Sequence, residues 1–413
     1  MRSIKDILIT QKRELELIKQ QKYIKRNIEI KNLDTNIIKV IIGPRRVGKS
    51  FLVLHKLENF AYVNFDDEDL IKTQNYDEII DNLKEIYPNF KYLFLDEIQN
   101  LKNWELFVNR LQRQSYNLII SGSNSNLLSQ ELSTHLTGRH LLTLVFPFSF
   151  KEYTSYYDNQ TQSELKSKLN TYLENGGYPE TIVKNIPYKD YLSMLYDSIL
   201  FKDIIKRYEI KNPNILEELS RFLINNITNF FSYNKIKNTL NFDSVNTVKD
   251  YIKYLQDSFL FFELKRFSFK IKEQDNSNRK IYLIDNGFFN SKGFSFSKNI
   301  GKLFENLVAI KLKYKELQKQ IEFYYYKDKN DYEIDFLIRE NSKIQSLIQV
   351  SYDISNLKTK EREMRSLISA SKELNCDDLI IITNDYEAIE EFSWYSITKK
   401  IKFIPLFKYL LDD

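Results

Sequence analysis

The sequence is poor in cysteine, and this scarcity limits the class of protein to which it can belong. Cys376 is the one cysteine among 413 residues, so the chain cannot form an internal disulfide. Secreted domains that depend on a disulfide framework are therefore excluded, and a reducing, cytoplasmic setting is favoured.

Long apolar runs and a large excess of one charge are also missing. No stretch approaches the ~20 apolar residues that a membrane-spanning helix needs, and the first residues lack the apolar core of a signal peptide. The 61 Lys and Arg residues are set against 56 Asp and Glu residues, a net charge of +5. A surplus this small permits nucleic-acid binding but does not argue for it, because binding depends on a local basic patch. We expect a soluble protein without a membrane partner.

What the sequence does contain is enough apolar material for several domains. It is 42% hydrophobic and 28% charged, and 413 residues predict two to three domains at about 150 residues each. Short apolar runs at 37–42, 62–65, 92–95 and 118–120 alternate with helical patterns. This alternation predicts βαβ units and a parallel sheet.

Residues 43–50 read Gly-Pro-Arg-Arg-Val-Gly-Lys-Ser, between a predicted strand and a predicted helix. This is the spacing of a phosphate-binding P-loop, in which glycines let backbone N–H groups point at phosphate oxygens. We expect Lys49 to contact the β- and γ-phosphates and the Ser50 hydroxyl to bind Mg²⁺, so ATP and Mg²⁺ are the predicted cofactors. The predicted nucleotide-binding residues are Gly43, Pro44, Arg45, Arg46, Val47, Gly48, Lys49, Ser50 and Phe51.

Two carboxylates follow the apolar run at 92–95. A strand there brings Asp96 to the carboxyl edge of the sheet, where ligands bind in such folds, and Glu97 comes next. We expect Asp96 to hold the Mg²⁺ through a water molecule and Glu97 to polarise the attacking water. An exposed acidic strand end is the alternative.

Further candidates for the hydrolytic reaction come later in the chain. Ser123 and Asn124 follow the run at 118–120 and can orient the water or contact the γ-phosphate, although an ordinary turn fits the spacing nearly as well. Arg139 can reach the nucleotide of a neighbouring subunit in a homo-oligomer, with a solvated surface arginine as the alternative. The predicted catalytic residues are Glu97, Asp96, Lys49, Arg139 and Asn124.

The middle of the chain has the plan of a winged helix-turn-helix, with short helical patterns followed by Phe-rich strands. An apolar stripe from Val248 to Leu255 predicts a helix. Asn246 or Thr247 can cap its start. DNA contact and packing on the chain's own ATPase core both remain open, because acidic residues (Asp243, Asp250, Asp257 and Glu263) are mixed with the basic ones. The side chains available for phosphate contacts are Lys249, Lys253, Lys265, Arg266, Lys270 and Lys272.

In the last part of the chain, polar residues interrupt apolar patterns. Glu305 lies on the apolar stripe of a predicted helix, and Glu333 and Asp335 share one face of a predicted strand. Gln349 and Ser351 share a face of the next strand. Because carboxylates on apolar surfaces are costly to bury unless they are paired or metal-bound, we expect Glu305 and Asp335 to approach each other. With Gln349 close by, they would form a second site for a divalent cation.

These motifs resemble a prokaryotic, largely archaeal family of AAA-type P-loop ATPases. The resemblance implies an α/β fold with an AAA-type ATPase core around a parallel sheet, a winged helix-turn-helix and a C-terminal restriction-endonuclease-like α/β domain. The stretches that carry it are 43–50, 95–99, 121–124, 136–139, 146–150, 282–287, 301–306 and 333–336. The expected boundaries are 1–150 for the ATPase core, 151–214 for its helical extension, 215–290 for the winged helix and 291–413 for the last domain.

One departure from the resemblance concerns the endonuclease-like site. Ser351 stands where that site usually has a Lys, which helps to generate the attacking hydroxide, and Lys327 or Lys329 can substitute for it. An active nuclease, a DNA-binding remnant and a scaffold remain alternatives for this domain. For the whole chain we predict an ATP-hydrolysing AAA-type switch or motor that acts on DNA. The alternatives are an NTP-gated signalling or scaffold protein with a protein partner, and an ATP-regulated nuclease.

Overall fold

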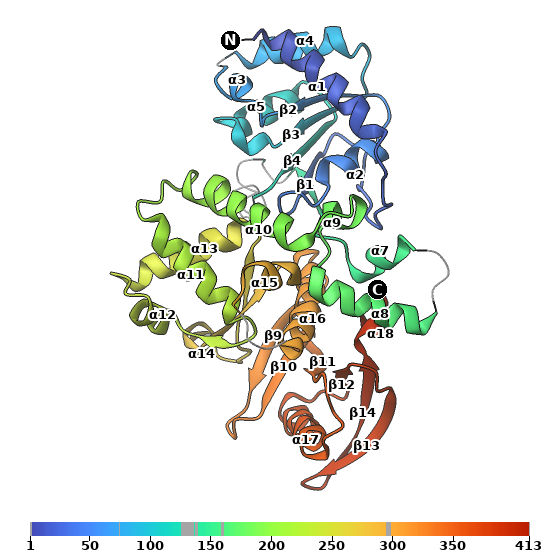
Figure 1. Ribbon diagram of the computed structural model, residues 1–413, viewed down its shortest axis with the longest axis vertical. Coiled ribbons are helices and arrows are strands. Elements are labelled where there is room, and N and C mark those ends of the chain that lie inside the picture. The colour runs from blue at the N-terminus through green and yellow to red at the C-terminus, as the bar shows by residue number, and fades with distance from the viewer. Residues whose placement is uncertain are drawn as a thin grey trace. The chain divides into compact units, whose positions relative to one another are not determined.

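The computed structural model describes residues 2–73, 75–124, 136, 139–157, 161–294 and 299–412. Thr137 and Gly138, part of one motif in the sequence, lie outside these residues. Contacts divide the chain into two compact units (Figure 1). The first comprises Met1–Phe146, Ile182–Asn185 and Asp257–Phe259, and the second comprises Pro147–Thr181, Ile186–Gln256 and Leu260–Asp413. No helix of the described residues combines the length and the apolar character needed to span a membrane.

The first unit is built around a five-stranded sheet in the order β2-β3-β4-β1-β5, in which each paired strand runs parallel to its neighbour (Figure 1). The predicted parallel sheet is confirmed, and its central strands are apolar because they are buried on both faces. The strands are β1 (Ile38–Ile42), β2 (Phe60–Asn64), β3 (Tyr92–Asp96), β4 (Leu118–Gly122) and β5 (His140–Leu144). The helices are α1 (Ile4–Lys19), α2 (Lys49–Lys56), α3 (Glu68–Ile71), α4 (Tyr76–Ile86) and α5 (Trp104–Arg113).

Two local differences from the sequence patterns appear in this unit. The periodic pattern at 5–25 predicts a helix over the whole stretch, but α1 ends at Lys19. Beyond it, the buried Arg26 guanidinium donates hydrogen bonds to the carbonyl oxygens of Val47 (3.1 Å) and Phe146 (2.7 Å), so tertiary contacts replace helical ones. The edge strand β5 has no clear sequence signal, because its first three residues are only partly buried.

The second unit begins with helices and continues with a small antiparallel sheet in the order β6-β8-β7. Helix α13 starts earlier than expected, and the Ser244 hydroxyl accepts the backbone N–H of Thr247 at 3.0 Å. The prediction that Asn246 or Thr247 caps this helix was therefore wrong. The helices are α7 (Phe150–Ser155), α8 (Gln162–Asn175), α9 (Pro179–Val183), α10 (Tyr188–Ser198), a π-helical turn (Ile199–Ile205), α11 (Pro213–Asn225), α12 (Tyr233–Thr239), α13 (Val245–Asp257), α14 (Ile271–Asn276) and α15 (Asn286–Lys292). The strands are β6 (Phe230–Phe231), β7 (Phe261–Leu264) and β8 (Arg279–Leu283).

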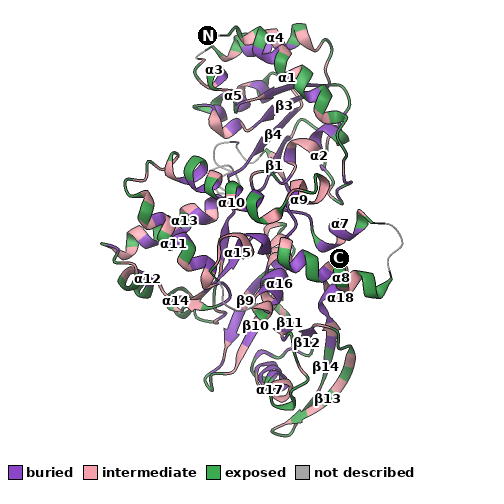
Figure 2. Ribbon diagram, in the orientation of Figure 1, coloured by how far each residue is buried: buried purple, intermediate pink, exposed green. Residues whose placement is uncertain are grey.

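The last part of this unit is a mixed six-stranded sheet in the order β13-β14-β12-β11-β10-β9. Its core packs around buried Leu337, Leu347 and Leu367, and Figure 2 shows the buried strands β10, β11 and β12 beside α17. The strands are β9 (Glu322–Lys327), β10 (Glu333–Glu340), β11 (Lys343–Val350), β12 (Leu379–Thr383), β13 (Ala388–Trp394) and β14 (Ile397–Pro405). The helices are α16 (Ile300–Leu317), α17 (Leu357–Leu374) and α18 (Leu406–Leu411).

A buried carboxylate, Asp285, joins the turn after α8 to the start of α15. Its Oδ2 accepts the backbone N–H of Gly177 at 2.7 Å, and its Oδ1 accepts that of Gly287 at 2.8 Å. A side chain at Gly176 would place its Cβ 1.8 Å from Asp285 Oδ1, so the chain needs glycine there. Burial raises the pKa of Asp285 to about 7, although the two N–H groups partly oppose that shift.

This shift predicts a pH-dependent stability. The folded chain holds the Asp285 proton more tightly than the unfolded chain, so the contribution of protonation is complete below about pH 4 and is lost as the pH rises toward about 7. We expect wild type to lose stability relative to Asp285→Asn by up to about 1.4 kcal/mol per pH unit between pH 5 and 7, and little above. Urea midpoints measured at pH 5, 6, 7 and 8 test this. A wild-type-to-variant difference that does not change with pH would contradict it.

Candidate functional site

The segment between β1 and α2 is a tight loop around a buried lysine. Gly48 adopts a left-handed conformation (φ 87°) immediately before α2, which glycine reaches without a steric penalty. At Gly43 an added Cβ would lie 1.8 Å from the carbonyl oxygen of Val145. Lys49 Nζ lies inside the loop and donates to the carbonyl oxygens of Gly43 (3.1 Å) and Pro44 (2.9 Å). The amine is thus held where phosphate oxygens would replace those carbonyls.

Asp96 ends strand β3 at the carboxyl edge of the sheet and accepts hydrogen bonds from three hydroxyl groups. Its Oδ2 accepts from Ser50 Oγ at 2.6 Å and from the Tyr62 hydroxyl at 3.1 Å, and its Oδ1 accepts from the Ser121 hydroxyl. Burial and the charge of Glu97 raise the pKa of Asp96, while the Ser121 and Ser50 hydroxyls oppose that rise. Adjacent hydroxyl and carboxylate oxygens at this spacing suit Mg²⁺, which takes few protein oxygens and keeps its waters.

Glu97 follows in a left-handed conformation (φ 50°), which turns its side chain back toward the loop. Its Oε1 lies 3.7 Å from Lys49 Nζ, and its Oε2 accepts from Gln99 Nε2 at 2.5 Å. Burial alone would raise the pKa of Glu97, but the Lys49 charge and the Gln99 hydrogen bond outweigh it and lower that pKa. The carboxylate is therefore ionised and able to accept a proton.

The structure brings most of the sequence candidates together at this edge, but not all of them. Asn124 is buried two residues after the end of β4. Arg139 is exposed, and its carbonyl oxygen accepts the N–H of Ile38 at 3.0 Å, at the amino end of β1. The P-loop begins after the other end of that strand, roughly 13 Å away along β1. Within one chain, Arg139 is therefore separated from the other predicted catalytic residues.

Sequence reasoning assigned no role to three residues that contact the two carboxylates. Tyr62 and Ser121 donate to Asp96, and Gln99 donates to Glu97. The signal for Ser121 is its place on the strand that pairs with β3, where small hydroxyl residues end an apolar run. For Gln99 the signal is its spacing, two residues after Glu97 within the short turn Ile98–Asn100.

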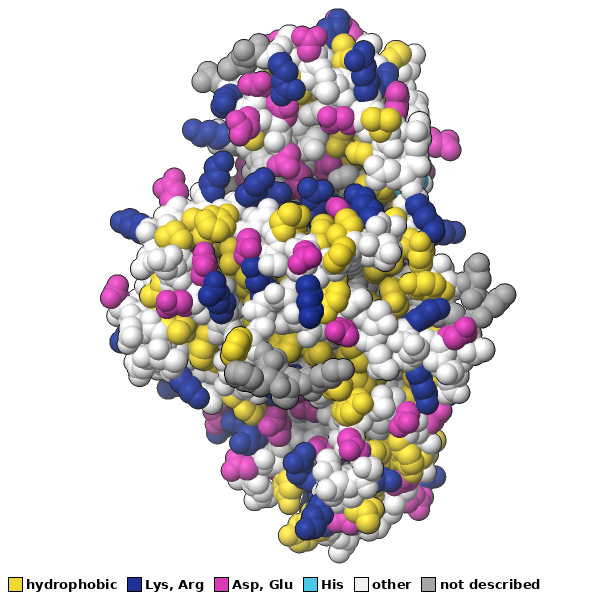
Figure 3. Space-filling model, in the orientation of Figure 1, with side chains coloured by type: hydrophobic (Ala, Val, Ile, Leu, Met, Phe, Trp, Pro, Cys, Tyr) yellow, Lys and Arg dark blue, Asp and Glu magenta, His cyan; other side chains and the backbone are white. Residues whose placement is uncertain are grey.

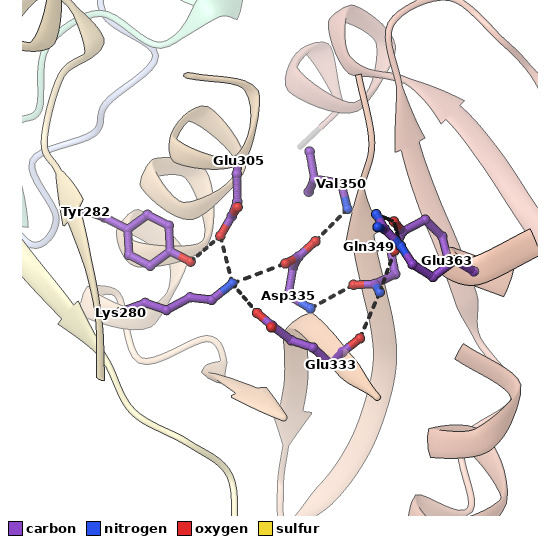
Figure 4. A network of polar contacts seen from close by, with 9 residues as sticks. Lys280, Tyr282, Glu305, Glu333, Asp335, Gln349, Val350 and Glu363 are labelled. Atoms are coloured by element: carbon purple, nitrogen blue, oxygen red, sulfur yellow. Dashed lines mark hydrogen bonds and ion pairs between the residues drawn. The ribbon is translucent and has the colours of Figure 1, made fainter. Parts of the chain in front are cut away.

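A second group of charged residues lies in the second unit (Figure 4). We call Glu305, Glu333 and Asp335 the acidic cluster. All three contact Lys280, a residue of β8 whose side chain is only 4% exposed: Nζ lies 3.1 Å from Glu305 Oε1, 2.6 Å from Glu333 Oε1 and 3.2 Å from Asp335 Oδ1. Burial would lower the pKa of Lys280, but the carboxylates, Glu305 first, outweigh it and raise that pKa. The cluster is therefore compensated by a cation of the chain itself.

Other groups use the remaining oxygens of this network. The Tyr282 hydroxyl donates to Glu305 at 2.7 Å, and the N–H of Val350 donates to Asp335 Oδ2 at 2.9 Å. Burial, followed by the charge of Asp335, raises the pKa of Glu305 to about 7, although Lys280 opposes this. The Gln349 side-chain oxygen accepts the N–H of Asp335 at 2.8 Å (Figure 4).

The arrangement corrects the predicted cation site. Glu305 and Asp335 converge as expected, but on Lys280, while the Gln349 oxygen is engaged by backbone. Within the described ranges, no group of three or more His, Cys, Asp or Glu residues is placed to hold a metal ion. Of the two lysines that were expected to substitute for the one absent at Ser351, Lys327 pairs with Asp331 at 2.9 Å and Lys329 is exposed. The cation that contacts the acidic cluster is Lys280 of β8. Lys280 lies far in sequence from the residues of the acidic cluster, so no motif spacing indicated that it would contact them.

Comparison with known proteins places these features in families. Residues 35–154 match an AAA domain, 166–297 match a domain of unknown function (DUF8612), and 300–406 match another (DUF4143). An uncharacterized protein of Methanocaldococcus jannaschii is 38% identical over 421 residues, which cover 96% of this chain and 93% of that protein. An uncharacterized protein of Haemophilus influenzae is 32% identical over 363 residues, covering 82% and 88%.

Among solved structures, the chain is similar to the Walker-type ATPase of Pyrococcus abyssi. The TM-score is 0.41 at 13% identity, covering 67% of this chain and 99% of that one. The AAA-domain match agrees with the loop and the parallel sheet described above, so the first unit contains a P-loop domain of the AAA type.

Proposed function

We propose that this chain, which belongs to the same family as its M. jannaschii relative, hydrolyses ATP in its AAA domain. The observation that carries the proposal is the convergence of two pairs at the carboxyl edge of the sheet. Ser50 Oγ lies 2.6 Å from Asp96 Oδ2, and Lys49 Nζ lies 3.7 Å from Glu97 Oε1. Cation, hydroxyl and paired carboxylates are the groups that phosphoryl transfer to water requires.

In this proposal each residue has a separate task. Lys49 exchanges the carbonyls of Gly43 and Pro44 for the β- and γ-phosphates. Ser50 and Asp96 would hold Mg²⁺, which neutralises the phosphate charge when it is bound. Glu97 accepts a proton from the attacking water, because its carboxylate is ionised in the folded chain. Asn124 is proposed to contact the γ-phosphate from the neighbouring strand end.

Arg139 belongs to this proposal only if the chain forms a homo-oligomer. Its side chain is exposed, and its backbone lies at the amino end of β1, away from the P-loop of the same chain. A role at the γ-phosphate therefore requires the nucleotide site of a neighbouring subunit.

We further propose DNA as the partner that ATP turnover serves. The support is the order α11-β6-α12-α13-β7-α14-β8, which is that of a winged helix with the short helix α14 added between its last two strands. In a winged helix, the helix corresponding to α13 reads the major groove. Lys249 and Lys253 are exposed on α13, one turn apart. Asp250 is exposed beside them, and Figure 3 shows basic and acidic side chains interspersed over this unit, so we expect modest affinity.

A restriction-endonuclease-like last domain remains part of the proposal, while DNA cleavage has less support. In the acidic cluster, Lys280 Nζ lies between the carboxylates that would bind a metal ion.

An NTP-gated scaffold with a protein partner is the competing function, and it differs from the DNA proposal in one measurable respect. DNA should change the turnover of ATP only if it is the partner.

Phosphate release from ATP tests the function, measured with Mg²⁺ at fixed salt, with and without single-stranded, duplex and branched DNA. We expect turnover by wild type, and a change of rate with DNA that weakens steeply as salt rises, because neutralised phosphates release counterions. Replacing Lys249 and Lys253 with Met should flatten that salt dependence and leave the DNA-free rate unchanged. Absence of turnover under every condition would overturn the proposal, whereas turnover indifferent to DNA would remove only the DNA part.

A further inference from the structure

We infer that Gln99 holds the water that attacks ATP, together with Glu97. The inference rests on the proposed ATP hydrolysis. It adds a residue that belongs neither to the P-loop nor to the pair Asp96 and Glu97. Gln99 would accept one hydrogen of the water through its side-chain oxygen, while Glu97 accepts the other.

The first support is the position of the Gln99 amide. The left-handed backbone of Glu97 begins the short turn Ile98–Asn100, and this turn folds Gln99 back over the preceding carboxylate. Gln99 Nε2 donates to Glu97 Oε2 at 2.5 Å and lies 3.4 Å from Ser123 Oγ. Ser123 is buried at the end of the neighbouring strand, so the amide is fixed from two sides.

The second support is the side-chain oxygen of the same amide group. Gln99 Oε1 is buried and accepts no hydrogen bond from any group in the described part of the chain. The orientation of the amide follows from chemistry, since an ionised carboxylate can only accept and so must face the NH₂ group. The oxygen is therefore left as an acceptor that needs a donor, and buried acceptors without donors are uncommon in folded proteins.

A water molecule would satisfy both groups, because it carries two hydrogens to donate. Gln99 Oε1 is covered in this structure, so the side chain has to shift for the water to reach it. With one directed at Glu97 and the other at Gln99 Oε1, a lone pair of the water oxygen is left for the phosphate that Lys49 would hold. Lys49 Nζ itself lies 3.7 Å from Glu97 Oε1. Glutamine orients the attacking water in the same manner in other P-loop enzymes. A single carboxylate leaves the water free to rotate about one hydrogen bond, and a second acceptor removes that freedom.

The water oxygen forms a bond to the γ-phosphorus, and the bond between that phosphorus and the β,γ-bridging oxygen breaks. One water proton passes to the Glu97 carboxylate, and ADP leaves with the electron pair of the bridging oxygen. Gln99 gains and loses no proton, so it is a positioning group that touches the reacting water.

The experiment compares wild type with Gln99→Met, which keeps the length of the side chain and removes both hydrogen-bonding atoms. Gln114→Met is the matched control, since Gln114 is exposed at the end of α5 in the same domain. We expect Gln99→Met to lower kcat by about 100-fold, with little change in KM for ATP.

Nucleotide binding, measured with a fluorescent ATP analogue, reports whether the variant has folded. A kcat equal to that of wild type would overturn the inference. If Gln99→Met does not bind ATP, Gln99→Asn decides: the shorter amide should bind ATP with lowered kcat, and wild-type kcat would again overturn it. Failure of the proposed function itself looks different, because wild type would then release no phosphate above the level of Lys49→Ala.

Discussion

Glu97→Gln is expected to leave ATP bound and to lower its turnover by about 10²–10⁴-fold. The substitution keeps the shape of the side chain but removes the ionised oxygen that would take the proton from water. It also removes the ion pair with Lys49, whose Nζ lies 3.7 Å from Glu97 Oε1, so the lysine remains free to bind phosphate. Single-turnover phosphate release and equilibrium ATP binding, measured on the same preparation, separate the two effects.

Two further variants serve as controls for Glu97→Gln. Lys49→Ala should lose nucleotide binding, because the amine that replaces loop carbonyls with phosphates is gone. Glu78→Gln makes the same chemical change at an exposed position of α4 and should hydrolyse ATP like wild type. Equal turnover by Glu97→Gln and wild type would show that Glu97 is not the base, whatever its distance from the P-loop.

Lys280→Met is expected to destabilise the second unit by about 3–5 kcal/mol, since removing one partner of a buried ionic group leaves the others uncompensated. Here three carboxylates, Glu305, Glu333 and Asp335, would lose the ammonium that lies within 3.2 Å of each. Methionine fills a similar volume, so lost charge and not a cavity would cause the effect. Urea unfolding at pH 7.5 measures it.

The matched control is Lys270→Met, because Lys270 is exposed and its ion pair with Glu273 lies at the surface. That change should cost roughly 0–1 kcal/mol. Adding Glu305→Gln to Lys280→Met should recover part of the lost stability, since it removes one of the stranded charges. If Lys280→Met had the same urea midpoint of unfolding as wild type, solvent and not Lys280 would compensate the charge of the acidic cluster.

The nucleotide site could be predicted from the sequence because the residues that form it lie in short, continuous segments. Gly43 to Ser50 are consecutive residues, and Asp96 and Glu97 directly follow an apolar strand. Parallel strands bring their carboxyl ends to one edge of the sheet, so separate local patterns predict a shared site without knowledge of the packing. Gln99 could be noticed but not interpreted, because only the left-handed turn at Glu97 decides which way its amide points.

The acidic cluster could be predicted only in part, because its residues are distant from one another in the sequence. Its carboxylates could be suspected, since charge on an apolar stripe needs compensation. The compensating group could not be identified, because Lys280 is 25 residues from Glu305 and 55 from Asp335 in sequence. A lysine in a strand reads as a solvated side chain, and burial here results from the packing of β8 against α16 and β10. The sequence by itself thus determined the P-loop chemistry, while tertiary packing decided that a lysine meets the carboxylates where a metal ion was expected.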